Sequence, residues 1–274
     1  MTGLAVLLGV PVTHSLSPAL HNAAFREHGI PAAYVACDVP PDRLAEAVHG
    51  LDALGAMGAN VTIPHKQAVQ AHCAAIAPEA AVVGAVNTLV RGEAGWIGHN
   101  TDVAGFLTPL ADHALDGAEV TVLGAGGAAR AVVYGLLSAF SPSRITIASR
   151  RPEQADALAE AFAAHDTAGA LAVAAMEDAP AADLVVNATP LGMTGREDHT
   201  PYPRADLGPG QTAYDLVYRP RETRFLREAA ANGAQTIGGL PMLIGQAAAA
   251  FELWTGRPFP TETARRAALD AFAP

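Results

Sequence analysis

Cysteine and basic side chains are scarce in this sequence. Only 2 of the 274 residues are cysteine, Cys37 and Cys73, and their spacing matches no metal-binding or redox motif. Without a disulfide framework, the default expectation is a reducing, cytoplasmic location. Lys and Arg together number 17 against 27 Asp and Glu, which gives a formal charge of -10. This surplus of negative charge argues against nucleic acid as the main partner.

Long apolar runs are missing as well. No run reaches the roughly 18 residues of a membrane-spanning helix, so no membrane partner is predicted. Residues 1–9 have no basic leader and are predicted to form a first strand rather than a signal peptide. Hydrophobic residues make up 50% and charged residues only 16%, which excludes a disordered chain. The length suits one large domain or two small ones.

The first hundred residues alternate between strand and helix patterns. Ser17 followed by Pro18 predicts a helix start, with the serine as cap and the proline at the first helical position. Alternation of this kind predicts a mostly parallel sheet surrounded by helices. The predicted strands are 4–10, 33–39, 59–63, 86–90 and 96–98, the last two paired, and the predicted helices are 19–28, 42–54 and 64–73.

A second α/β run follows a helix predicted at 103–113, which we interpret as a bridge between two domains. The run ends in two helices, 241–255 and 261–273, that no strand separates, so they are predicted to pack back on the first domain. The predicted domains are 1–102 with 239–274, and 103–238. The strands of the second are 120–123, 145–149, 170–174, 184–187, 213–216 and 235–237, and its helices 127–140, 152–164 and 222–232.

The strand at 120–123 runs directly into Gly124-Ala125-Gly126-Gly127-Ala128-Ala129, which has the G-x-G-x-x-A spacing of a dinucleotide-binding turn. Gly124 permits the tight turn, Gly126 lets the backbone approach a pyrophosphate, and the small Ala129 lets the helix pack close to the strand. The helix N-terminus offers free N–H groups to the phosphates. The alternative is an ordinary glycine-rich turn, but the flanking strand and helix favour a cofactor site.

The end of the second strand of such a domain selects the nucleotide. An acidic residue there favours NAD, whereas arginine accommodates the 2′-phosphate of NADP. Here the strand ends in Ser149-Arg150-Arg151, and no acid is present. Guanidinium groups match phosphate geometry and stay charged. We therefore predict NADP, the alternative being two solvated arginines at a helix entrance.

Two charged residues of the first domain are candidates for acid–base chemistry. The predicted helix from Pro64 would place Lys66 in its first turn, and Asp102 would begin the helix after Asn100-Thr101. A lysine can act as general acid or base, and a carboxylate can orient it. The alternatives are a solvated surface lysine and an acid that merely favours a helix start. The sequence does not show that the two side chains touch.

Other chemistries find little support. His14, His21 and His65 lack the carboxylate–histidine spacing of a zinc site, so no metal is predicted. No G-x-S-x-G elbow is present, which argues against a serine hydrolase.

Taken together and in this order, the polar clusters resemble the shikimate dehydrogenase family along the whole chain. The similar segments are His14-Ser15-Leu16-Ser17-Pro18 with His21-Asn22, Asn60-Val61-Thr62-Ile63-Pro64-His65-Lys66, Gly84-Ala85-Val86-Asn87-Thr88, Gly98-His99-Asn100-Thr101-Asp102, Asn187-Ala188-Thr189-Pro190-Leu191-Gly192-Met193, Asp215-Leu216-Val217-Tyr218, and Gly239-Leu240-Pro241-Met242-Leu243 with Gln246.

The resemblance implies an α/β fold with an N-terminal α/β substrate domain, a Rossmann NADP-binding domain, C-terminal helices that return to the first domain, and substrate in the cleft between domains. It implies reversible NADPH-dependent reduction of 3-dehydroshikimate to shikimate, on the way to aromatic amino acids. Lys66 and Asp102 would be the acid–base pair. The implied substrate ligands are Ser15, Ser17, Thr62, Asn87, Tyr218 and Gln246. The expected cofactor-binding residues are Gly124, Ala125, Gly126, Gly127, Ala128, Ser149, Arg150, Arg151, Thr189, Leu216 and Gly239.

One segment departs from the family pattern. The family often has Asn-Arg-Thr or Asn-Arg-Ser after the second strand, where this chain has Ser149-Arg150-Arg151. The first arginine is kept, so the departure bears on the strength of NADP preference. Two alternatives stay open: a quinate/shikimate dehydrogenase that also uses NAD, and a non-catalytic NADP sensor on the same scaffold. A monomer or a homodimer is expected.

Overall fold

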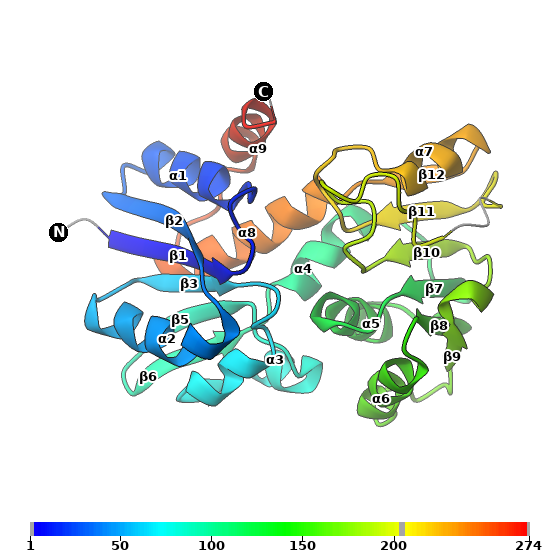
Figure 1. The fold of residues 1–274 in the computed structure, drawn as a ribbon, viewed down its shortest axis with the longest axis horizontal. Helices are drawn as coiled ribbons and strands as arrows, with labels where there is room; N and C mark the ends of the chain where they lie inside the picture. Colours follow the sequence, from blue (N-terminus) through cyan, green and yellow to red (C-terminus); the bar gives the residue numbers. More distant parts are fainter. Residues whose placement is uncertain (1–2, 203–205, 273–274) are drawn as a thin grey trace. The chain divides into compact units, whose positions relative to one another are not determined.

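The computed structural model describes residues 3–202 and 206–272 (Figure 1). The chain divides into two compact units, residues 1–105 with 244–274 and residues 106–243. The divisions fall inside helices α4 (Asp102–Leu107) and α8 (Leu240–Thr255). The boundaries predicted from the sequence, after residues 102 and 238, lie within a few residues of these divisions. Each unit is built on its own sheet.

The first unit contains a mixed sheet of order β2-β1-β3-β5-β6-β4. Strand β1 pairs in parallel with β2 and β3, whereas β5 runs antiparallel to both β3 and β6. Strand β4 also pairs in parallel with β6, so β5 alone of the six described strands runs against the others, and the predicted mostly parallel sheet is confirmed. The strands are β1 Gly3–Gly9, β2 Ala32–Asp38, β3 Gly58–Val61, β4 Ala75–Ile76, β5 Thr88–Gly92 and β6 Gly95–His99.

Helices cover both faces of this sheet (Figure 1). Val6 and Leu8 of β1 face a core formed with Leu44, Val48 and Leu51 of α2. The alternate residues of β1, Ala5 and Leu7, are also buried, as expected for a strand covered on both sides. The connecting helices and turns are α1 Ser17–Glu27, η1 Pro41–Arg43, α2 Leu44–Ala53, η2 Ala68–His72 and α3 Pro78–Val83.

Two local predictions in this unit were wrong. Helix α1 begins at Ser17 itself, its cap is Leu16, and no side chain caps it. Ser15 supplies the local bond instead, since its hydroxyl accepts from the backbone N–H of Ser17 at 3.2 Å. The helix expected from Pro64 is absent, because turns occupy the segment until the short 3-10 helix η2 begins at Ala68.

The C-terminal helices return to the first unit, as predicted. Helix α9 (Thr261–Asp270) packs against α1. The indole N–H of Trp254 in α8 donates to the carbonyl oxygen of Leu89 at 3.0 Å. A Cβ at Gly58 of β3 would overlap this indole ring, so the glycine makes room for the helix. The predicted end of the last helix, Ala273, lies outside the described residues.

His21 of α1 is a buried histidine within an aromatic cluster. Its ring stacks on Tyr34 at 4.4 Å between centroids and also contacts Trp254 and Phe259. The side chain is 0% exposed, and among the described residues neither ring nitrogen has a hydrogen-bond partner. Burial lowers the pKa of His21 from 6.5 to about 3, because the charged imidazolium is disfavoured away from water.

We expect this histidine to make the protein less stable as the pH falls. Between pH 6.5 and about 3 the unfolded chain binds a proton at His21 that the folded chain does not bind, so the free energy of unfolding decreases on acidification. From pH 6.5 to 5 the loss amounts to about 2 kcal/mol. Urea unfolding at both pH values should show a smaller loss in His21→Phe, which keeps the ring stack. His49 is exposed, and the control variant His49→Gln should lose as much unfolding free energy on acidification as the unaltered protein. An equal pH dependence in His21→Phe and the unaltered protein would contradict the argument.

The second unit contains a parallel sheet of order β12-β11-β10-β7-β8-β9. Read from β9, this is the 3-2-1-4-5-6 order of a Rossmann fold, with β7 as its first strand. The sequence prediction of a Rossmann domain is thus confirmed. The strands are β7 Glu119–Leu123, β8 Arg144–Ser149, β9 Leu171–Ala175, β10 Leu184–Asn187, β11 Thr212–Asp215 and β12 Gln235–Ile237, and the helices and turns are η3 Thr108–Leu110, α5 Gly127–Ala139, α6 Pro152–Phe162, η4 Met176–Asp178 and α7 Arg224–Ala231.

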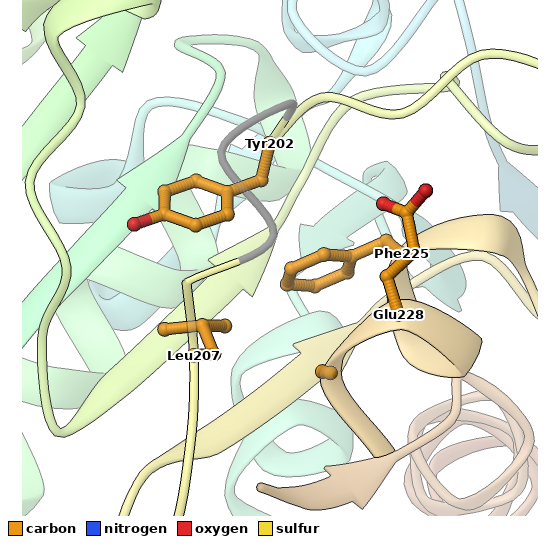
Figure 2. Close-up of a pocket in the computed structure, with 5 residues that line it drawn as sticks. Tyr202, Leu207, Phe225 and Glu228 are labelled. Atoms are coloured by element: carbon orange, nitrogen blue, oxygen red, sulfur yellow. The ribbon is translucent and has the colours of Figure 1, made fainter. Parts of the chain in front are cut away.

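A separate apolar cluster lies between α7 and the strands β10 and β11. It includes Leu123, Val185, Ala213 and Phe225. Figure 2 shows a small pocket at its border, where the rings of Tyr202 and Phe225 face Leu207 beside Glu228. None of the predicted site residues lines this pocket, which belongs to the core packing of the unit.

Candidate active site

The predicted catalytic residues of the first unit meet at one edge of its sheet. Parallel strands β1 and β3 end there at Gly9 and Val61. Strand β5 runs the other way, so it begins there at Thr88, opposite Asn60 and His99. The segments that leave these strand ends, 10–16, 62–67, 87 and 100–102, carry all the predicted polar residues of the unit except Ser17 and Gln246.

Lys66 and Asp102 form an ion pair at this edge. The side chains are 14% and 8% exposed, so both are largely removed from water. The lysine ammonium donates to Oδ2 of the aspartate. The other carboxylate oxygen, Oδ1, accepts from the amide of Asn87 at 2.8 Å. Both oxygens of the carboxylate are thus engaged, which fixes its orientation toward the lysine.

A turn, and not a helix, places Lys66. The buried His65 ring lies 2.7 Å from the carbonyl oxygen of Val39, to which its Nε2–H donates. The carbonyl of Lys66 accepts from the backbone N–H of Val86 at 2.7 Å. The segment is therefore tied to the end of β2 on one side and to the chain before β5 on the other. The prediction that Lys66 lies in the first turn of a helix is therefore wrong.

Asn87 is fixed by its neighbours in turn. Its Oδ1 accepts from the backbone N–H of Thr101 at 2.7 Å, which orients its amide toward Asp102. Behind it, the Thr88 hydroxyl accepts from Asn60 at 3.0 Å, and Asn60 accepts from the Tyr34 hydroxyl at 2.8 Å. Asn60, Asn87, Thr88 and Thr101 are buried. A buried and fully bonded polar network of this kind holds one geometry.

The other predicted substrate residues are distributed over both units. Thr62 follows β3, and a Cβ at Gly9 would overlap its methyl group. Ser15 is half-buried, while Ser17 and Gln246 are buried, the latter in α8. All four belong to the first unit. Tyr218 belongs to the second unit, three residues after the end of β11.

The glycine turn after β7 has the geometry that a dinucleotide needs. Gly124 has a φ of 111°, which side chains other than hydrogen rarely permit. At Gly126 a Cβ would meet nothing within 4 Å, so the backbone faces open space. Ala129 is 0% exposed against the sheet. Helix α5 begins at Gly127 with no side-chain cap, which leaves its first N–H groups available to an anion. Ala125 and Ala128 complete the turn, which therefore fits a pyrophosphate.

The residues after β8 are placed to meet a phosphate. Ser149 is the last residue of the strand, and its hydroxyl accepts from the backbone N–H of Arg151 at 3.2 Å. Arg150 and Arg151 are exposed. Within residues 3–202 and 206–272, neither guanidinium has an ion pair or a hydrogen bond to another side chain. Two exposed guanidinium groups at this strand end fit the 2′-phosphate of NADP.

Thr189, Leu216 and Gly239 follow the ends of strands β10, β11 and β12 in turn. Thr189 follows β10, and its backbone N–H and hydroxyl both donate to Oδ1 of Asn187, at 2.9 and 2.7 Å. Leu216 follows β11 and donates its N–H to the carbonyl of Asn187 at 3.0 Å. A Cβ at Gly239 would overlap the Leu216 carbonyl oxygen, so only glycine fits there.

Sequence reasoning assigned no role to the side chains that hold these positions, namely Asn187, Asp215 and Thr223. Asn187 donates to Oδ1 of Asp215 at 2.8 Å, and the Thr223 hydroxyl donates to Oδ2 at 2.6 Å. Burial raises the pKa of Asp215 to about 6, although these hydrogen bonds oppose the shift. One signal was present in the sequence, since Asn187 and Asp215 each stand in a predicted strand as a polar residue at or near its end.

Comparison with protein families covers most of the chain. Residues 7–89 match the shikimate dehydrogenase substrate binding domain, residues 109–192 match shikimate / quinate 5-dehydrogenase, and residues 239–269 match the shikimate 5′-dehydrogenase C-terminal domain. Over 268 residues the chain is 55% identical to the shikimate dehydrogenase (NADP(+)) of Salinibacter ruber, with 94% of each chain covered. The chain belongs to the shikimate dehydrogenase family.

Solved structures of the family have the same fold. A shikimate dehydrogenase in complex with NADP+ superposes with a TM-score of 0.91 at 38% identity, covering 98% of this chain and 95% of the other. The Thermus thermophilus enzyme, in complex with NADP(H) and shikimate, gives 0.87 at 40% identity, covering 98% and 100%. A quinate dehydrogenase from Corynebacterium glutamicum, in complex with NAD, gives 0.88 at 32% identity, covering 98% and 99%. Fold alone therefore does not select the substrate within the family.

Two absences concern the described residues, 3–202 and 206–272. No group of three or more His, Cys, Asp or Glu side chains in that part of the chain is placed to hold a metal ion. None of the helices described is both long enough and apolar enough to cross a membrane.

Proposed function

We propose that the protein catalyses the reversible NADPH-dependent reduction of 3-dehydroshikimate to shikimate, a step toward aromatic amino acids. The observation that carries this proposal is the buried ion pair of Lys66 and Asp102, held by Asn87 at the edge of the first sheet. Full-length identity of 55% to a shikimate dehydrogenase supports the choice of substrate.

Lys66 is the proton donor in this mechanism. NADPH, when bound, supplies the hydride for the ketone carbon. The ammonium of Lys66 stabilises negative charge on the ketone oxygen and gives it a proton. In the opposite direction the neutral amine accepts the proton of the hydroxyl. Asp102 keeps the lysine Nζ in one place, and Asn87 keeps Asp102 from rotating.

The remaining predicted residues would bind the two ligands. A cyclic polyol acid needs several fixed hydroxyl and amide partners, and we assign this role to Ser15, Ser17, Thr62, Asn87, Tyr218 and Gln246. For the cofactor, the turn from Gly124 to Ala128 and the first N–H groups of α5 would hold the pyrophosphate. Ser149, Arg150 and Arg151 would hold the 2′-phosphate, and Thr189, Leu216 and Gly239 would flank the nicotinamide. A cytoplasmic location and a monomeric or homodimeric state remain predictions.

Steady-state assays with two acids and two cofactors test the proposal. The purified protein should produce the absorbance of NADPH when given shikimate and NADP. The value of kcat/KM should be lower with quinate, and lower with NAD. A faster NAD-linked oxidation of quinate would instead indicate a quinate dehydrogenase. NADP binding with no turnover of either acid would indicate a sensor.

A further inference from the structure

A fully buried carboxylate, Asp215, lies where the strands of the second sheet end, and the proposed function gives it no role. Asp215 ends β11, and its register partner Asn187 ends β10. Both side chains are 0% exposed. No Lys, Arg or His of the described segments forms an ion pair with Asp215. Burying a carboxylate without a cation costs folding free energy unless hydrogen bonds compensate for the lost water. The hydrogen-bond partners of Asp215 therefore indicate its role.

Three donors from three separate segments converge on this carboxylate. Oδ1 accepts from the Asn187 amide at 2.8 Å and from the backbone N–H of Val217 at 2.9 Å. Oδ2 accepts from the Thr223 hydroxyl at 2.6 Å. Thr223 is the cap of α7, where its hydroxyl also accepts from the Leu226 N–H. One side chain thus ties together the ends of β10 and β11 and the start of α7.

Two of these ties, through Asn187 and Val217, lead to residues assigned to the nicotinamide. Asn187 fixes the orientation of Thr189, because the backbone N–H and the hydroxyl of Thr189 both donate to Oδ1 of Asn187. The bond to Val217 closes the turn that contains Leu216. The carbonyl of Val217 then accepts from the N–H of Gly239 at 3.2 Å. The adenosine-side residue Arg150 follows β8, which is separated from β11 by β10 and β7, and no bond connects it to this network in the described residues.

We propose that Asp215 is a positioning residue that fixes Thr189, Leu216 and Gly239 for the nicotinamide half of the cofactor and leaves the adenosine half to other residues. The proposal rests on the proposed function, because the cofactor-binding roles of Thr189, Leu216 and Gly239 are part of that proposed function. Asp215 acts only through Asn187, Val217 and Thr223 and does not itself contact the cofactor. Its removal should therefore weaken recognition of one end of the dinucleotide selectively.

Calorimetric binding of two ligands tests this selectivity without any substrate. NADPH contains both the nicotinamide and the adenosine 2′-phosphate, whereas 2′,5′-ADP contains the 2′-phosphate and adenosine but no nicotinamide. In Asp215→Ala we expect the Kd for NADPH to rise about tenfold, which corresponds to about 1.4 kcal/mol, while the Kd for 2′,5′-ADP stays within about twofold. In Asp215→Asn the amide keeps the shape. Its oxygen can accept from Val217 and Asn187 and its N–H can donate to Thr223, so most of the NADPH affinity should return.

A second pair of variants decides the matter if Asp215→Ala does not fold. Thr223→Val removes the partner of Oδ2 and the cap of α7, and leaves both partners of Oδ1, whereas Thr223→Ser keeps the hydroxyl for both bonds. We expect selective loss of NADPH affinity in the valine variant and recovery in the serine variant. Equal weakening of both ligands, or unchanged NADPH affinity in a folded Asp215→Ala or Thr223→Val variant, would overturn the proposal. Failure of the unaltered protein to bind NADPH would instead contradict the proposed function.

Discussion

Lys66→Ala should lower kcat for shikimate oxidation by at least about 100-fold, because a positioned acid–base group contributes about 10²- to 10⁴-fold to a rate. Affinity for shikimate should change little, since hydroxyl and amide side chains supply most of the proposed substrate contacts. Lys66 is the single lysine of the chain. The ion pair with Asp102 holds this one ammonium in place. Steady-state rates in both directions, with shikimate affinity from calorimetry, measure the two effects separately.

The exposed neighbour Gln67 provides the matched control, since Gln67→Ala alters the same turn but should leave kcat within about twofold. Asp102→Asn keeps the shape but removes the charge that holds the ammonium, so its kcat should lie between those of Lys66→Ala and the unaltered protein. Because the chain has one lysine, ¹⁵N labelling of lysine side chains gives a single Nζ signal that reports on Lys66 directly. A kcat for Lys66→Ala near that of the control would remove the lysine from the mechanism.

The Rossmann unit was predictable because its signals are local. The four central strands, β7, β8, β10 and β11, are short and largely buried runs, and β10 begins and ends at the predicted residues, 184 and 187. The glycine turn was equally predictable, since the φ of Gly124 and the burial of Ala129 follow from the small residues alone. Patterns of this kind depend only on residues adjacent in the chain.

The local conformation at Lys66 was not predictable in the same way. Proline is common at the first position of a helix, but the helix that Pro64 predicted is absent. The bonds that fix this segment come from far along the chain, through His65 to Val39 and through the Lys66 carbonyl to Val86. Tertiary hydrogen bonds therefore overrode a local preference.

Contacts between distant residues depended on the order of the strands. Lys66 and Asp102 are 36 positions apart, and they meet because β5 inserts antiparallel between β3 and β6. Asn187 and Asp215 meet because β10 and β11 are parallel neighbours in register. A family resemblance indicated the first pair by its role. The resemblance included the segments that begin with Asn187 and Asp215 but gave these two residues no role, and they stabilise other residues of the site.

Arg150→Ala should raise the KM for NADP between about 10-fold and 100-fold, because a hydrogen bond to a charged group is worth roughly 1.5–3 kcal/mol. NAD lacks the 2′-phosphate, so its KM should change by no more than about twofold. The ratio of the two kcat/KM values, NADP over NAD, should therefore fall by most of this factor. The exposed guanidinium at the end of β8, with no bond to another described side chain, makes the phosphate its expected partner.

Two further arginines separate this effect from a general loss of positive charge. Arg26 is exposed on α1 in the first unit, so Arg26→Ala should leave the NADP/NAD ratio unchanged. Arg151, also exposed, follows Arg150 directly, and Arg151→Ala should lower the ratio less if Arg150 is the main phosphate ligand. High salt should reduce the difference between the unaltered protein and Arg150→Ala, because ions screen an exposed charge pair. If Arg150→Ala changed the KM for NAD as much as that for NADP, the arginine would serve the shared part of the two cofactors, and the preference for NADP would need another source.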